Sequence, residues 1–364
     1  MSAVAPGDRA VAHVRARAER AQEQARARIA DLLAGAGLPI SAAAALTSFI
    51  RQHGRVTLNF HPDRLLANGD TVAEGLLRDG VYRSQFETRI SNGSRTGFPG
   101  GERDGWEKRL FGGVYLAPEI DADERPKYGA LDLMRHPDGG SPRFGSCYFV
   151  LRPHVTARCT LTWGDSHAGP EHVATMTVLE PLIAAMLGAV EASGNVLGVA
   201  GMTVTSVLRR LTSQEALGPR NPAQAPAGRA LDDYIEAQVH GPIVLSSDTE
   251  ALVVDPAFEG TATGHALKDL CGRNALRLMN HQGFVLTPPE VPADFRGPRM
   301  VPLARRVADR YAVPSGTIDA ASLGLAAAAL HREPGSWEGW GSYEETLQHI
   351  KQLWHVLVRF GRPR

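Results

Sequence analysis

Short segments rich in β-forming residues recur through the middle of the chain, and each is followed by a loop that contains glycine or proline. Residues 55–60, 146–151 and 156–163 are the clearest of them, and residues 81–90 have a similar composition. No long helical pattern alternates with these segments, as it would in a doubly wound parallel sheet. The sequence therefore predicts an α+β fold, built mainly from antiparallel sheets with flanking helices.

The two ends of the chain have helical patterns. Small apolar residues recur with helical period from Asp8 to about Leu33, and a second helix is expected from Ser41 to about Gln52. Residues 1–54 are thus predicted to be an N-terminal helical segment that packs on the domain behind it, with a partner-binding arm as the alternative. Residues 55–364 are predicted to form a single elaborated α+β domain with a C-terminal helical part.

The clearest helix lies in that C-terminal part. Ser342-Tyr-Glu-Glu345 has the form of a capping box. Apolar residues follow at spacings of three or four, namely Leu347, Ile350, Trp354, Leu357 and Phe360. We expect this face to be core, and the lysine, histidines and arginine of the helix to lie mostly on the other face. Residues 195–230, rich in glycine, proline and alanine, are expected to be a connector.

Composition narrows the class of protein. The chain has 364 residues, 43% of them hydrophobic, with 39 basic and 39 acidic residues. This balance argues against a partner recognised chiefly through its phosphates and favours a protein over a nucleic acid. The three cysteines have no C-x-x-C spacing, so the reducing cytoplasm is the default expectation. No apolar run long enough for a membrane span or a signal peptide is seen, and export by a route without such a signal stays open.

The usual signatures of nucleotide and metal chemistry are missing from the sequence. It contains no P-loop, no G-x-G-x-x-G and no H-E-x-x-H. His167 and His172 have a spacing that could bind a metal, but their loop context indicates surface residues. No metal site is therefore expected.

One predicted strand carries three functional groups. In Leu231-Asp-Asp-Tyr-Ile-Glu-Ala-Gln-Val-His-Gly241, the residues Glu236, Gln238 and His240 stand at alternate positions. A strand with period two directs all three to one face. That face either holds a polar ligand or is a solvated edge.

Other polar and aromatic residues stand at predicted strand ends and in Gly-rich loops. His61 and Arg64 follow the strand at 55–60, and a proline directly after His61 ends that strand. The remaining candidates for ligand binding are Tyr82, Arg83, Ser91, Asn92, Ser94, Tyr128 and Arg143. Together these residues predict a cleft with several cations, stacking aromatic rings and one carboxylate, which comes late in the sequence.

Several strings of the sequence occur together in one family. They are FHPDR, DGVYRSQFETRISNGS, PGGERDGWE, ERPKYGALDL, SPRFGSCYF, LDDYIEAQVHG, FRGP and HIKQLWHVLVRFG. On these strings the chain resembles the bacterial domain-of-unknown-function family numbered 3626, from about Val56 to Gly361. The N-terminal helix lies outside the resemblance, and the family name carries no activity.

The order of the polar segments is also similar to that of ADP-ribosyltransferases. The resemblance aligns His61 or Arg64 with the first motif, Ser91-Asn-Gly-Ser94 with the middle one and Glu236 with the last. It implies an ADP-ribosyltransferase-like core and NAD as a substrate. One position departs from the pattern, because Tyr234 stands where that superfamily often has Glu or Gln.

The resemblance also implies roles for the candidate residues. Glu236 would stabilise an oxocarbenium-like state as the bond between nicotinamide and ribose breaks. Arg64 and Arg83 would hold the pyrophosphate, and Tyr82 or Tyr128 would stack on nicotinamide. Two alternatives remain open: a metal-independent hydrolase of a phosphorylated or nucleotide substrate that uses His61, Asp63 and Glu236, and a non-catalytic module that binds a peptide or nucleotide. The acceptor, and whether the protein is a toxin or a regulator, stay open as well.

Overall fold

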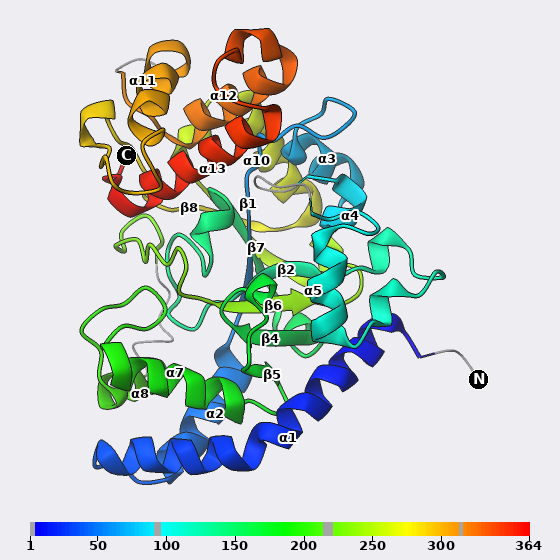
Figure 1. Cartoon of the computed structure of the whole chain (residues 1–364), viewed down its shortest axis with the longest axis vertical. Helices are drawn as coiled ribbons and strands as arrows, with labels where there is room; N and C mark the ends of the chain where they lie inside the picture. Colours follow the sequence, from blue (N-terminus) through cyan, green and yellow to red (C-terminus); the bar gives the residue numbers. More distant parts are fainter. Residues whose placement is uncertain (1–3, 91–95, 214–220, 313–315) are drawn as a thin grey trace.

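A single mixed sheet organises the molecule (Figure 1). The computed structural model describes residues 4–90, 96–213, 221–312 and 316–364. In these residues eight strands pair in the order β5-β4-β6-β2-β1-β3-β7-β8. The strands are β1 Val56–Phe60, β2 Lys127–Leu131, β3 Cys147–Leu151, β4 Cys159–Trp163, β5 Val173–Thr175, β6 Ile235–Val239, β7 Thr249–Val254 and β8 Arg277–Asn280.

Neighbouring strands run antiparallel except for the parallel pair β7 and β8. The predicted class, a mainly antiparallel α+β fold, is therefore confirmed, although one sheet replaces the several that were expected. β6 lies near the centre between β4 and β2, so that its side chains are buried on both faces.

The polar face of β1 positions a loop of the site. Val56 and Leu58 are buried on the apolar face, whereas Thr57 and Asn59 face the loop at 138–145. The Asn59 amide donates to the carbonyl oxygen of Asp138 at 3.0 Å, and the Thr57 hydroxyl accepts from the backbone N–H of Gly140 at 3.0 Å. β1 thus fixes the loop that leads to the 3₁₀ turn η3 Pro142–Phe144.

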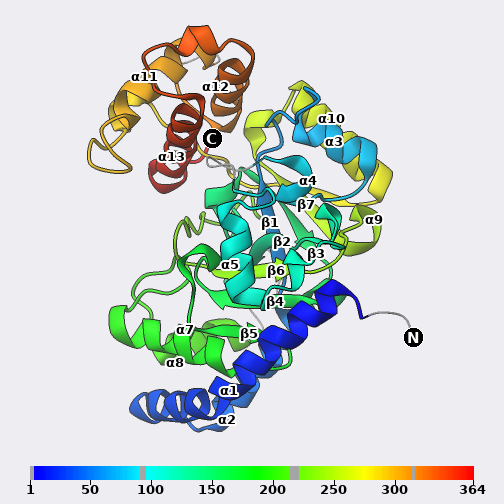
Figure 2. The ribbon, with the colours of Figure 1, turned by 45° about the vertical axis from the view of Figure 1, so that its right-hand side comes forward.

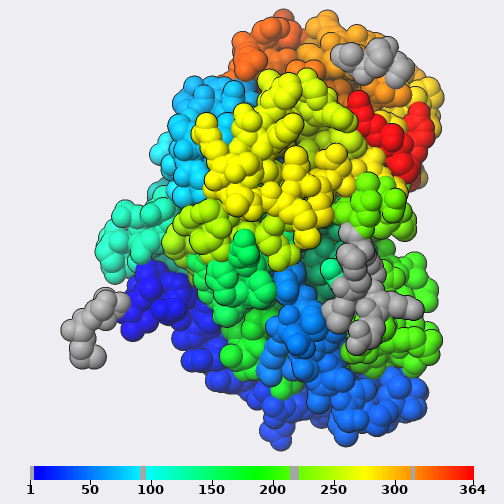
Figure 3. Space-filling view, turned by 180° about the vertical axis from the view of Figure 1, so that it is seen from behind, coloured from blue at the N-terminus to red at the C-terminus, as the bar shows by residue number. Residues whose placement is uncertain are grey.

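The N-terminal helices lie at one end of the molecule, and the C-terminal helices lie at the other (Figures 1 and 3). α1 Pro6–Gly35 packs on α7 Glu180–Ser193 and on β5, and α2 Ser41–His53 packs on α8 Val204–Thr212. Ala10 and Val14 of α1 are fully buried, and Arg26 pairs with Glu180 of α7 at 2.8 Å. These helices are packed on the domain rather than extended from it.

The C-terminal helical part consists of α11 Met300–Tyr311, α12 Ala320–Arg332 and α13 Tyr343–Phe360, which pack on one another (Figure 2). The predicted capping box begins α13, because the Ser342 hydroxyl accepts from the Glu345 N–H at 3.2 Å. The expectation that its polar residues face away from the core is wrong for His355, which is buried, and Phe360 is 41% exposed. α13 lies between the other two helices and the η3 loop, so it buries two faces instead of one.

Two further local predictions are wrong. Residues 81–90 do not form a strand, because Ser84 and Glu87 form a capping box that begins the short helix α4 Gln85–Thr88. The expected connector at 195–230 contains α8, which begins with a capping box of Thr203 and Ser206. In both places the capping residues begin a helix, although the amino-acid composition of the segment had indicated a strand or a connector.

The remaining elements connect the sheet to these helices. They are α3 Val72–Asp79, α5 Glu102–Phe111, α6 Pro153–Thr156, α9 Leu245–Asp248 and α10 Ala262–Asn274, with 3₁₀ turns η1 Val114–Leu116, η2 Ala122–Glu124, η4 Ser166–Ala168, η6 Pro256–Phe258, η7 Pro288–Glu290 and η8 Pro334–Trp337. Among the helices of the described ranges, none combines the length and the apolar character needed to cross a bilayer.

Candidate functional site

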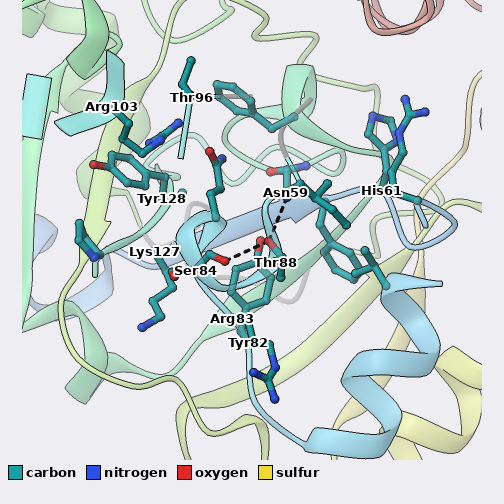
Figure 4. Close-up of a pocket in the computed structure, with 18 of the residues that line it drawn as sticks. Asn59, His61, Tyr82, Arg83, Ser84, Thr88, Thr96, Arg103, Lys127 and Tyr128 are labelled. Atoms are coloured by element: carbon teal, nitrogen blue, oxygen red, sulfur yellow. Dashed lines mark hydrogen bonds between the residues drawn. The ribbon is translucent and has the colours of Figure 1, made fainter. Parts of the chain in front are cut away.

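One pocket of about 360 Å³ collects most of the candidate residues (Figure 4). Glu236, His61 and Arg64 all line it, although they come from β6 and from the loop after β1. Tyr82, Arg83, Tyr128 and Arg143 line it as well. The volume lies in the range of small-molecule sites. Ser91, Asn92 and Ser94 lie outside the described residues.

The pocket carries an excess of positive charge. Among the described residues, its lining contains six lysine and arginine residues and four aspartate and glutamate residues. The neutral total of the whole chain therefore conceals a local basic surface. A pocket of this kind favours an anionic ligand.

Glu236 is a buried carboxylate whose position is fixed by hydrogen bonds. Only 4% of the residue is exposed. The Gln238 amide donates to its Oε1 at 2.8 Å, and the Ser166 side chain also bonds to it. Burial, followed by the nearby charge of Asp165, raises the pKa of Glu236 to about 7. The carboxyl group therefore titrates close to neutral pH.

Gln238 and His240 share the face of β6 with Glu236, as the alternation predicts, but neither lines the pocket. The Thr160 hydroxyl of β4 donates to Gln238 Oε1 at 2.7 Å. His240 Nε2 lies 3.0 Å from the same hydroxyl, and His240 Nδ1 lies 2.6 Å from the Tyr115 hydroxyl. The two residues therefore lie beneath Glu236, where direct contact with a ligand is blocked.

The hydrogen bonds beneath Glu236 have one consistent direction. Burial lowers the pKa of His240 to about 3, so its imidazole is neutral. Because the Thr160 hydroxyl donates to Gln238, His240 Nε2–H must donate to Thr160, and Nδ1 accepts from Tyr115. Every bond from Tyr115 onward then donates toward Glu236. This chain orients the Gln238 amide so that its N–H group faces the carboxylate.

An arginine covers the aromatic wall of the pocket. The guanidinium carbon of Arg103, in α5, lies 4.5 Å from the ring centre of Tyr128 and 4.9 Å from that of Trp106. The Tyr128 hydroxyl donates to Glu107 at 2.8 Å, and Glu107 pairs with Arg125 at 2.6 Å. Burial raises the pKa of Glu107, whereas Arg125 opposes this shift. The network ties α5 to β2 and fixes the Tyr128 ring.

His61 and Arg64 lie at the other end of the pocket and are 6% and 8% exposed. Within the described residues, His61 Nε2 and Arg64 Nη1 have no hydrogen-bond partner. Burial, with a smaller effect from Arg64, places the pKa of His61 well below its ordinary range, so the imidazole is neutral. Asp63 does not line the pocket; it packs against Gly324 of α12. The three residues of the hydrolase alternative are therefore not assembled at one wall.

Tyr82 and Arg83 line the pocket but are engaged elsewhere. The Tyr82 ring packs edge-on against Phe60 at 6.2 Å between ring centres. Arg83 pairs with Asp79 at 3.1 Å and with Glu87 at 3.5 Å. Arg64 is therefore better placed than Arg83 to bind an anion.

The lining residues that sequence reasoning missed include Arg103, Trp106 and Lys351. Arg103 and Trp106 stand three residues apart, directly after the Gly-rich loop, and this helical spacing could have paired them. Lys351 stands three and four residues before Trp354 and His355, which places it on the same helix face. The apolar stripe of α13 was the clearer signal in the sequence, so the face that carries Lys351 was not recognised as part of a site.

In the parts of the chain that the structure describes, no group of three or more His, Cys, Asp or Glu side chains is arranged to hold a metal ion. No curated protein matches the sequence. A family model described as "Protein of unknown function (DUF3626)" matches residues 55–360, which include β1, β6, α13 and all the described residues of the pocket. By this match over most of its length, the chain belongs to the DUF3626 family.

Proposed function

We propose that the protein is an ADP-ribosyltransferase-like enzyme that uses NAD as its substrate. The observation that carries the proposal is the position of Glu236, a buried carboxylate that opens onto a pocket with an aromatic wall and an excess of cations. NAD offers a ring that stacks, a diphosphate that cations bind and a ribose that a carboxylate can orient. The ADP-ribosyltransferase-like core implied by the sequence resemblance is part of the same proposal.

The proposed reaction breaks the bond between C1 of the ribose and the nicotinamide nitrogen. Nicotinamide leaves with the bonding electron pair, and the ribose carbon acquires positive charge, as in glycoside cleavage. The Glu236 carboxylate stabilises that charge. An acceptor then attacks C1 and loses a proton. A protein is favoured over a nucleic acid as the acceptor, because the chain as a whole has no net charge.

Release of nicotinamide from labelled NAD by the full-length protein tests this proposal. Glu236→Gln keeps the size of the side chain and its hydrogen bond from Gln238, but it removes the charge. We expect release to fall by on the order of 100-fold or more. Glu250→Gln on β7, outside the pocket, is the matched control and should keep wild-type release.

The folding of Glu236→Gln can be separated from its chemistry. The folded state binds the Glu236 proton more tightly than the unfolded state does, because burial raises its pKa from 4.5 to about 7. The ionisation of Glu236 therefore lowers stability as the pH rises through this interval. At pH 8 the variant should unfold no more easily than the wild type.

The alternatives predict other outcomes. Absence of nicotinamide release with every acceptor tested would contradict the proposal. Release of phosphate from a nucleotide without any need for NAD would favour the hydrolase. Saturable binding of a nucleotide or peptide without turnover would favour the binding module.

A further inference from the structure

The pocket has an end where buried polar atoms have no partner. His61 Nε2 and Arg64 Nη1 are buried and line the pocket, and the described part of the chain supplies neither with a hydrogen bond. A buried polar atom without a partner costs free energy, and such atoms are rare in folded proteins. A ligand with several acceptor oxygens would satisfy both.

A lysine from the C-terminal helical part lies on the same wall. Lys351 lines the pocket and forms no hydrogen bond or ion pair with any described residue. Burial, and then the nearby charge of Arg143, lower its pKa to about 8. The carboxylates of Asp165 and Asp232 act on this ammonium group only from beyond ion-pair distance, so a directly bound anionic ligand would supply the close counter-ion.

α13 is fixed so that Lys351 faces the pocket. The Trp354 indole donates to the carbonyl oxygen of Pro142 at 2.7 Å, and its ring packs edge-on against His61 at 5.2 Å. One position on, His355 Nε2 lies 3.2 Å from the carbonyl oxygen of Arg143 and donates to it. Because Lys351 stands one turn earlier on the same helix face, these contacts set its distance from both His61 and Arg143.

Arg143 completes the cluster from the η3 loop. One of its guanidinium nitrogens pairs with Asp232 at 2.7 Å, and the Asp232 side chain is 59% exposed. Its Nε has no partner in the described residues. Three cations from separate parts of the chain, Arg64, Arg143 and Lys351, therefore share one end of the pocket.

We propose that Lys351, with Arg64, Arg143 and His61, forms a subsite for a diphosphate, and that the ligand is a nucleoside diphosphate or its ester. The choice of a diphosphate rests on the proposed function; the anion site itself rests on the four side chains. The C-terminal helical part is then a ligand-binding element, and Glu236 is left to contact the sugar.

Titration calorimetry of the full-length protein with inorganic pyrophosphate tests the subsite. The wild type should bind pyrophosphate, and Lys351→Met should weaken binding by at least about tenfold. Lys351→Arg keeps the charge and should retain most of the affinity. Lys268→Met in α10, where the lysine is exposed, is the matched control and should leave affinity unchanged.

A wild-type protein that does not bind pyrophosphate would overturn the inference, and so would a folded Lys351→Met variant with wild-type affinity. Lys351 has no hydrogen bond to lose, so the variant should keep the wild-type melting temperature. If Lys351→Met does not fold, Lys351→Gln replaces it in the same measurement. ADP as the second probe should bind more tightly than pyrophosphate, and equal affinities would contradict the nucleoside part of the proposal.

The subsite and the proposed function can fail separately. Pyrophosphate binding that depends on Lys351, in a protein that releases no nicotinamide, would support the subsite and contradict the proposed function. Nicotinamide release that depends on Glu236, with an unchanged KM for NAD in Lys351→Met, would support the proposed function and contradict the subsite.

Discussion

At the scale of single residues, Glu236 shows how the surroundings of a side chain change its pKa. An exposed glutamate is ionised at neutral pH, whereas burial on β6 raises the pKa of this one to about 7. The chain of donors that ends at the Gln238 amide opposes the shift without cancelling it. Protonation of Glu236 is therefore sensitive to small changes of pH.

The rate of nicotinamide release should depend on this titration. The proposed chemistry needs the carboxylate, so the rate should rise with pH and reach half of its plateau near pH 7. A pH profile of kcat/KM from pH 5 to 9 measures this, and a fall above pH 8 is expected from the loss of the Lys351 proton. The residual rate of Glu236→Gln should lack the inflection, and a wild-type rate that falls between pH 6 and 8 would contradict the assigned role.

At the scale of elements, α5 and β2 are held together by buried charge. Arg125 stands two residues before β2 and pairs with both Asp104 and Glu107 of α5, at 2.8 and 2.6 Å. Glu107 is only 1% exposed and also accepts from Tyr128. The aromatic wall of the pocket thus depends on an ion pair that lies behind it.

Removal of the Arg125 cation should lower the stability of the folded protein. Arg125→Met leaves Glu107 as an uncompensated buried charge, and it should lower the free energy of unfolding by about 3–5 kcal/mol. Arg83→Met removes a pair at the surface, where the side chain is 48% exposed, and should cost less than about 1 kcal/mol. Denaturant unfolding of both variants measures the difference; equal losses would show that the buried network does not stabilise α5.

At the scale of the whole molecule, the C-terminal helices close one side of the pocket. α13 contributes Lys351 and contacts the η3 loop, while Gly324 of α12 packs directly on Asp63 in the loop that carries His61 and Arg64. A Cβ atom at position 324 would overlap the Asp63 carboxylate. The glycine therefore lets the two parts of the domain approach each other.

Gly324→Ala should lower the free energy of unfolding by about 1–3 kcal/mol, because the two parts must separate or Asp63 must move. Gly188→Ala is the matched control in another helix, α7, where a Cβ atom would meet open space. That change should stabilise the protein by about 0.5–1 kcal/mol. Thermal and denaturant unfolding measure whether each substitution raises or lowers the stability. A stabilising effect of the substitution at position 324 would contradict this account of the contact.

Local signals determined much of the fold. Alternation placed Glu236, Gln238 and His240 on one face of a strand, and the proline after His61 ended β1 where it was expected to end. Capping boxes marked the start of α13 and, against our expectation from composition, of α4 and α8. Each of these signals depends on neighbours within one turn or one strand, so it can be read from the sequence alone.

Only the tertiary structure decided which residues meet. Strand pairing brings Glu236 near the loop after β1, and helix packing brings Lys351 to the same pocket from the far end of the chain. The same packing turned Gln238 and His240 into buried supports and separated Asp63 from the pocket. Such contacts depend on strand order and on the shape of surfaces far apart in sequence, which no local period encodes.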